Sequence, residues 1–168
     1  MANTYTLINS ITVGSGGAAN MTFSSIPQTY TDLQLFVTAR IPDATYGTDI
    51  YLAFNGSSSS QTGKRIYGYS GTAYSDTTAA AGFTNGSNAT SNTFTSNSIY
   101  VPNYTSSNNK SWSVDLVTEN NSTTAYLPGL FCGLWSNTAA ITSIAITAFG
   151  GSSFVQYSTA YLYGIKNS

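Results

Sequence analysis

The sequence has no histidine, and its 168 residues include one cysteine, five basic and six acidic side chains. Histidine is the commonest general base and the commonest ligand of transition metals, so its absence removes Ser-His-Asp and Cys-His catalysis. The lone Cys132 excludes a disulfide within the chain, and its apolar neighbours predict that its thiol is buried. We therefore expect no catalytic residue, no cofactor and no bound metal.

The six carboxylates form no pattern typical of acid-base or calcium chemistry. Asp115 and Glu119 on one face of a strand would lie roughly 13 Å apart, whereas a glycosidase needs about 5–10 Å between its two carboxyl groups. Asp43 and Asp49 flank a short loop that lacks the alternating oxygen ligands of a calcium-binding loop. The sequence therefore predicts that Asp115 and Glu119 are solvated, that Asp43 to Asp49 form a plain hairpin or loop, and that the protein is not an enzyme.

Charge is too sparse for a nucleic-acid-binding protein. The net charge is −1, and the basic residues are scattered along the chain, whereas a phosphate backbone requires a basic patch. These basic residues are Arg40, Lys64, Arg65, Lys110 and Lys166. No apolar run approaches the roughly 18 residues of a membrane-spanning helix, and the first residues lack the segments of a secretory signal. We expect a protein made in a cytoplasm that binds neither nucleic acid nor membranes.

Serine, threonine and asparagine are abundant, with 25, 25 and 15 residues, and 14% of the residues are aromatic. A chain this rich in aromatics and this poor in charge is not typical of disordered proteins. Short runs of valine, isoleucine, threonine, tyrosine and phenylalanine alternate with turn-forming clusters, and no segment has helical periodicity. A surface of hydroxyls and amides with a net charge near zero also favours association with other proteins.

About ten runs are typical of strands, and three of them alternate clearly between apolar and other residues. Their predicted core faces are Leu33, Leu35, Val37 and Ala39; Ile50, Leu52 and Phe54; and Trp112, Val114 and Leu116. Because the spacing of βαβ units is missing, the runs predict one all-β domain over residues 1–168, a jelly-roll-like antiparallel β-sandwich with almost no helix. Residues 71–98 are expected to form an elaborated loop region.

An aromatic cluster is the best candidate for a contact with a partner. Arg65, Tyr67 and Tyr69 share one face of a predicted strand, and Tyr74 and Phe83 follow it. Tyrosine and arginine are enriched at contact hot spots, and flat aromatic rings also stack on sugars. Two interpretations stay open: the cluster is a partner-contact surface, or its side chains cap one face of a sheet.

Several segments carry a family resemblance: YTLI at 5–8, ITVG at 11–14, FSSIPQTYTDL at 23–33, FNG at 54–56, RIYG at 65–68, AAITSI at 139–144 and STAYLYGI at 158–165. Together with their flanks they cover about half of the chain, and they resemble small virion structural proteins of tailed bacteriophages, including phages of cyanobacteria. The resemblance implies a β-sandwich subunit assembled on a phage particle. It carries over no functional residue, because these segments are strand and turn signatures.

The resemblance implies a place either on the capsid or in the tail of the particle. The small size, the lack of a long fibrous region and the low charge lead us to expect a capsid decoration, or cement, protein. Such a protein would bind the major capsid protein or other virion proteins, assemble as a homotrimer and stabilise the shell. The alternative is a tail-fibre or receptor-binding adhesin in which Tyr67, Tyr69 and Tyr74 stack on host surface polysaccharide. A third hypothesis is a free carbohydrate-binding module or a glycan-cleaving enzyme.

Overall fold

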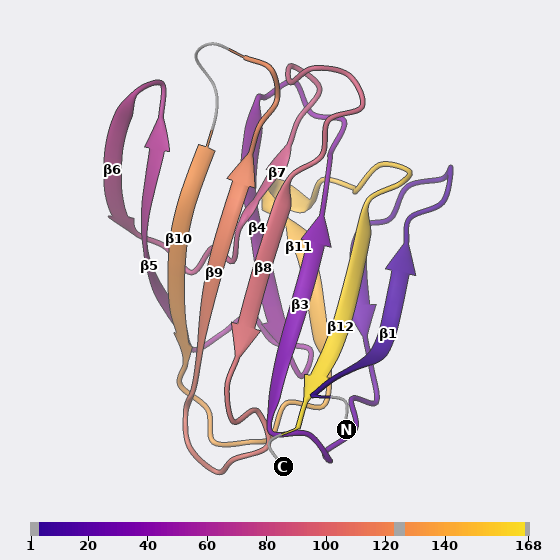
Figure 1. Cartoon of the computed structure of the whole chain (residues 1–168), viewed down its shortest axis with the longest axis vertical. Helices are drawn as coiled ribbons and strands as arrows, with labels where there is room; N and C mark the ends of the chain where they lie inside the picture. Colours follow the sequence, from indigo (N-terminus) through magenta and orange to yellow (C-terminus); the bar gives the residue numbers. More distant parts are fainter. Residues whose placement is uncertain (1–3, 123–126, 167–168) are drawn as a thin grey trace.

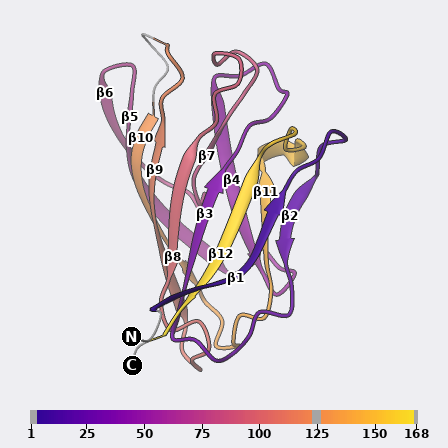
Figure 2. The ribbon, with the colours of Figure 1, turned by 45° about the vertical axis from the view of Figure 1, so that its right-hand side comes forward.

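The computed structural model describes residues 4–122 and 127–166, which form two antiparallel sheets packed face to face (Figures 1 and 2). The larger sheet contains β1 (Tyr5–Thr12), β3 (Asp32–Thr38), β5 (Gln61–Tyr69), β6 (Thr72–Thr77), β8 (Ser96–Val101), β9 (Lys110–Thr118), β10 (Leu127–Trp135) and β12 (Thr159–Ile165). The smaller sheet contains β2 (Asn20–Phe23), β4 (Gly47–Phe54), β7 (Phe83–Asn85) and β11 (Ile144–Ala148). The predicted all-β sandwich is confirmed.

The larger sheet has the strand order β1-β12-β3-β8-β9-β10-β5-β6, and the smaller sheet has the order β2-β11-β4-β7. Figure 1 looks onto the larger sheet, with the smaller sheet behind it, and Figure 2 shows the two layers obliquely, after a turn of 45°. The described residues thus form twelve strands, against about ten expected, and a single short 3-10 turn, η1 (Phe149–Gly151). Strands β1 and β6 are the edges of the larger sheet.

The core lies between the two sheets, and it includes the three faces predicted from alternation. Every residue predicted on those faces is buried, with an exposed fraction of at most 3%. β9 shows the reason most clearly, because buried and exposed side chains alternate along all nine of its residues. The clean alternation follows from an antiparallel sheet with one face on the core and the other in solvent.

The expectation of a loop over residues 71–98 is wrong for the strands that lie within it. β6, β7 and the first residues of β8 fall inside this range, and the segments 78–82 and 86–95 connect them. Every side chain of β6 is exposed and every side chain of β7 is buried. Neither strand therefore alternates between apolar and polar residues, which is the pattern on which strand prediction depends.

Candidate functional site

The five predicted contact residues come together between the β5–β6 hairpin and β7. Strands β5 and β6 pair so that Arg65 lies opposite Asp76 and Tyr67 lies opposite Tyr74. The rings of Tyr67 and Tyr74 stack, with 5.4 Å between centroids and 20° between planes. Tyr67 also packs edge-to-face against Phe83 of β7, at 6.0 Å. Tyr69 lines the same groove, so the structure brings the whole cluster together.

Arg65 is the centre of this cluster. Its Nε and Nη2 donate hydrogen bonds to the two carboxylate oxygens of Asp76 at 2.7 and 3.0 Å, and its Nη1 donates to Asp49 Oδ1 at 2.6 Å. Its guanidinium carbon lies 4.7 Å from the ring centroid of Tyr67 and 5.4 Å from those of Phe83 and Phe131. Charge-assisted bonds of this fork-like geometry fix both position and orientation.

Electrostatics in the cluster follow from its partial burial. Desolvation alone would lower the pKa of Arg65, but the hydrogen bonds and charges of Asp76 and Asp49 outweigh it and raise the pKa overall. Tyr51 donates its hydroxyl hydrogen to Asp49 Oδ2 at 3.3 Å. Burial, and then the nearby Asp49 charge, raise the pKa of Tyr51. Asp49 is therefore held from two sides, by a guanidinium and by a phenol.

The sequence did not indicate that Asp49 and Asp76 belong to this cluster; Asp49 was expected only at the end of a plain hairpin or loop. One signal could have placed Asp76. Ser70 and Gly71 have positive φ angles of 49° and 77°, the geometry of a two-residue type I′ hairpin turn. Such a turn sets the register of the two strands and places Asp76 opposite Arg65. Asp49 comes from β4 in the other sheet, and only the packing of the two sheets brings it to Arg65.

The cluster lines an open groove of about 540 Å³ between the β5–β6 hairpin and residues 45–49, which lead into β4. At its base, the side chains of Arg65 and Asp49 are 13% and 17% exposed. Exposed aromatic side chains border the groove: Tyr46, Tyr69, Tyr74 and Phe149. The groove thus combines a fixed polar base with several accessible rings.

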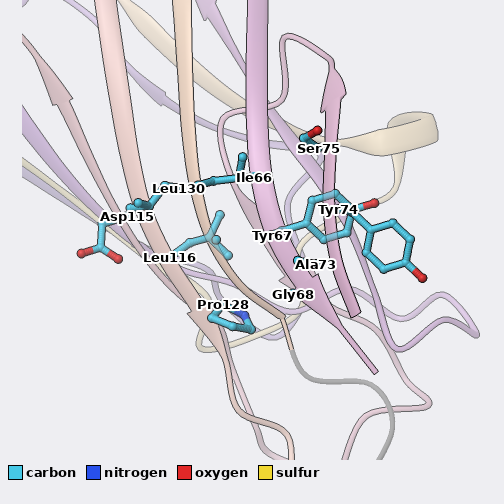
Figure 3. Close-up of a pocket in the computed structure, with 11 residues that line it drawn as sticks. Ile66, Tyr67, Gly68, Ala73, Tyr74, Ser75, Asp115, Leu116, Pro128 and Leu130 are labelled. Atoms are coloured by element: carbon cyan, nitrogen blue, oxygen red, sulfur yellow. The ribbon is translucent and has the colours of Figure 1, made fainter. Parts of the chain in front are cut away.

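The opposite, outward face of the same strands is apolar. Ile66 and Leu130 are paired across β5 and β10, and they are 57% and 56% exposed. Together with Pro128 and Ala73 they line a shallow depression of about 600 Å³. Figure 3 shows Ile66, Leu130 and Pro128 on neighbouring strands, while the rings of Tyr67 and Tyr74 extend away from them.

Cys132 lies on this outward face of β10 and is exposed, so the expectation of a buried thiol is wrong. Its neighbours Phe131 and Gly133 take the inward positions of the strand, and the apolar neighbours Leu130 and Leu134 are themselves exposed. The apolar residues around Cys132 therefore lie on both faces of β10, one buried and one exposed. Their presence in the sequence did not show on which face Cys132 lies.

Among residues 4–122 and 127–166, no three histidine, cysteine or acidic side chains come together as a group that could hold a metal ion. Within the same residues, no helix has the length and apolar character needed to cross a membrane.

No protein-family model matches the sequence, and no curated protein is similar to it. One solved structure with a weak likeness is a fructofuranosidase variant from Schwanniomyces occidentalis complexed with fructosylnystose. It shares 6% identity with a TM-score of 0.27, and the match covers 99% of this chain and 35% of that chain. A likeness at that TM-score carries no argument about fold or function, so the groove must be interpreted from its own geometry.

Proposed function

We propose that this protein is a non-catalytic structural subunit of a bacteriophage particle, namely a decoration protein that binds the assembled capsid and stabilises it. The observation that carries the proposal is the outward face of the larger sheet at β9, β10 and β5. Its exposed apolar side chains are Ile66, Val117, Leu130 and Leu134. Exposed apolar patches on a soluble subunit mark sites of contact with other proteins.

The charge distribution on this face supports a protein partner. In the described strands β9, β10, β5 and β6, its charged side chains are Lys64 and Asp115, at separate positions. The centres of protein interfaces are depleted of charge in the same way. The β6 edge adds a second feature, because the unpaired backbone of an edge strand can pair with a neighbouring chain. Both features favour a subunit that works in an assembly. The family resemblance favours a phage particle, and the small size, low charge and lack of a long fibrous region favour a place on its capsid, with the copies arranged as trimers.

A decoration protein stabilises a shell through mass action. It binds the assembled shell and not the dissociated subunits, so binding opposes disassembly by RT ln(1 + [L]/Kd). This amounts to about 2.7 kcal/mol per site at a hundredfold excess of ligand over Kd. This role requires a surface complementary to the shell and many copies of the protein. It requires no catalytic residue.

The copy number of the protein in purified virions tests the proposal. We expect quantitative gel staining to give hundreds of copies per particle, and particles stripped of the protein to come apart at a lower temperature. Adding the purified protein back should restore the original temperature. Stripped particles with an unchanged disassembly temperature would reject the decoration role.

A receptor-binding module of the phage tail is the second candidate, and the aromatic groove favours it. Tyrosine rings held over a polar base suit the recognition of host surface polysaccharide. The same gel measurement separates the candidates, because a tail module is present in a few to a few dozen copies per particle. If the protein were absent from purified virions, both candidates would be rejected.

The non-catalytic part of the proposal has a test of its own. Asp49 lines the groove and Asp76 lies beside it, opposite Arg65 on the neighbouring strand, and both carboxylates form ion pairs with Arg65. An ion pair needs an ionised carboxylate, whereas the acid of a glycosidase must carry a proton. We expect no release of reducing ends when the protein is incubated with polysaccharides, and a steady release would overturn the assignment.

A further inference from the structure

We infer that the groove between the β5–β6 hairpin and residues 45–49 binds a neutral saccharide. The inference rests on the tail-module candidate for its biological role. The groove belongs to a single subunit, however, so binding can be measured without the phage particle. The argument has three parts: the rings, the polar base and the net charge of the groove.

The rings of the groove are held in place before a ligand arrives. Tyr74 is 44% exposed, yet its ring is stacked on Tyr67, which is itself packed against Phe83. A ring fixed in this way loses little side-chain freedom when a ligand covers it. Aromatic rings present a large flat apolar surface, and the C–H groups on one face of a pyranose match such a surface. Tyr46 and Phe149 lie across the groove and offer further rings.

The base of the groove supplies donors and acceptors side by side. A guanidinium has five N–H donors, and Arg65 uses three of them on Asp49 and Asp76 among the hydrogen bonds of the described residues. Asp76 is not among the residues that line the groove, but it is hydrogen-bonded to Arg65 beside it, and its side chain is 42% exposed, so its carboxylate can accept more bonds. Neighbouring hydroxyls of a sugar both donate and accept, so they can bind a guanidinium and a carboxylate together.

The charge of the groove selects among saccharides. Of the charged residues, Asp49 and Arg65 line the groove and balance each other, and Asp76, which is paired with Arg65 beside the groove, brings the net charge of the three to −1. A uronate or phosphate would be repelled by this charge, whereas a neutral hexose would not. A cationic peptide is a different class of ligand, but both carboxylates are already paired with Arg65. The geometry therefore favours a neutral sugar.

Affinity electrophoresis of the purified protein tests the inference. Native gels would contain dextran, mannan or galactomannan as neutral polysaccharides, alginate as an anionic one, or no additive. We expect at least one neutral polysaccharide to retard the protein and alginate to leave its mobility unchanged. The inference would be overturned if none of the three neutral polymers retarded the protein, or if alginate retarded it equally. Soluble poly-lysine should not displace the protein from the polysaccharide, and displacement would favour a cationic peptide.

Matched variants locate the binding site. Tyr74→Ala should weaken retardation about tenfold, since truncation of a central aromatic contact typically has an effect of this size. Tyr74→Phe keeps the ring and should bind like the parent protein. Tyr157→Ala serves as the control, because Tyr157 is 66% exposed and is not among the residues lining the groove. Unchanged binding by Tyr74→Ala would show that the saccharide does not bind in this groove.

A second variant tests the polar base without removing a ring. Asp76→Asn keeps the shape of the side chain and should weaken binding severalfold while the protein stays folded, because Asp76 lies on an exposed edge strand. Thermal unfolding of each variant verifies the fold. Binding by Asp76→Asn at the parent level would reject the role of the carboxylate. If the protein bound a neutral polysaccharide but was absent from virions, the proposed function would fail and this inference would stand.

Discussion

Lys110 is a charged side chain that is buried in the folded protein. It begins β9 and is 1% exposed, although lysine is seldom fully buried. Its Nζ donates hydrogen bonds to the backbone oxygens of Ser106 and Ala139, both at 2.6 Å. Burial lowers the pKa of Lys110, because desolvation penalises the ammonium ion. The two acceptors lie in loops far apart in the sequence, so no local pattern could have predicted this site.

Replacing Lys110 by methionine should destabilise the protein by about 1–3 kcal/mol. The methionine fills a similar volume but removes the donor from two partly buried hydrogen bonds to backbone carbonyl oxygens, and this loss outweighs the relief of desolvation. Urea unfolding measures the effect. Lys64→Met is the matched control, because Lys64 is exposed on β5 and should change stability by less than about 0.5 kcal/mol. Equal stability of the two variants would contradict the structural role of Lys110.

Tyr100 makes stability depend on alkaline pH. Burial, together with its hydrogen bond to Asp32 Oδ2 at 2.8 Å, raises the pKa of Tyr100 to about 12. Between the ordinary value near 10 and this value, the folded protein keeps a proton that the unfolded chain releases. This contribution to stability is therefore full below pH 10 and is lost as the pH rises through 12.

The variant Tyr100→Phe tests this dependence, because it removes the titrating group. The difference in free energy of unfolding between the parent protein and the variant should be constant up to about pH 10 and should shrink above it. Urea unfolding at a series of pH values measures the difference. Tyr157→Phe changes an exposed position, so its free energy of unfolding should differ from that of the parent protein by the same amount at every pH. A constant difference between Tyr100→Phe and the parent protein through pH 12 would refute the prediction.

Pairs of strands use glycine to make room for aromatic rings. Gly133 of β10 lies opposite Trp112 of β9, and a Cβ atom at Gly133 would collide with the indole ring. Gly164 of β12 lies in the same way against the ring of Tyr30. Glycine normally weakens a strand, but here each one permits a close approach of a large side chain. The two glycines thus help to define the packing of the larger sheet.

The variant Gly133→Ala should destabilise the protein by about 1–3 kcal/mol, because the methyl group forces the buried Trp112 ring to shift. Thermal and urea unfolding measure the loss. Gly14→Ala is a suitable control, since a Cβ atom there meets nothing within 4 Å and the residue does not need a positive φ. If both variants were as stable as the parent protein, the close approach of Trp112 would not be a constraint.

The strands also show what the sequence could and could not predict. Alternating runs such as Leu33–Ala39 or Trp112–Leu116 predicted strands and their buried faces correctly, because one face packs on the core and the other meets solvent. β6 and β7 lack that contrast and were missed. In the groove, Arg65, Tyr67 and Tyr69 were predicted from one strand face, whereas Asp49 was not connected to them. Its contact with Arg65 depends on how two sheets pack, and local periodicity contains no information about that.

The whole molecule uses one hairpin for two surfaces. Strand β5 directs Arg65 and Tyr67 into the groove, and it directs Ile66 outward beside Leu130 of β10 (Figure 3). A subunit bound to other proteins through the outward face could therefore keep its groove open. We therefore expect that a substitution on the outward face affects association with other proteins and leaves saccharide binding in the groove intact.

The double variant Ile66→Asp with Leu130→Asp tests this separation. Both side chains are more than half exposed, so the variant should fold and should keep its melting temperature within a few degrees. Two added charges on an apolar contact face should abolish association with capsids or with other copies of the chain, because their desolvation is not compensated. Sedimentation velocity and particle binding measure this loss, and Tyr157→Asp is the control at an exposed site elsewhere.

The groove of the double variant should be unaffected, so its retardation by a neutral polysaccharide should stay at the parent level. Normal association by the double variant would show that the outward face is not the contact surface, whereas loss of both activities would show that the two surfaces are coupled.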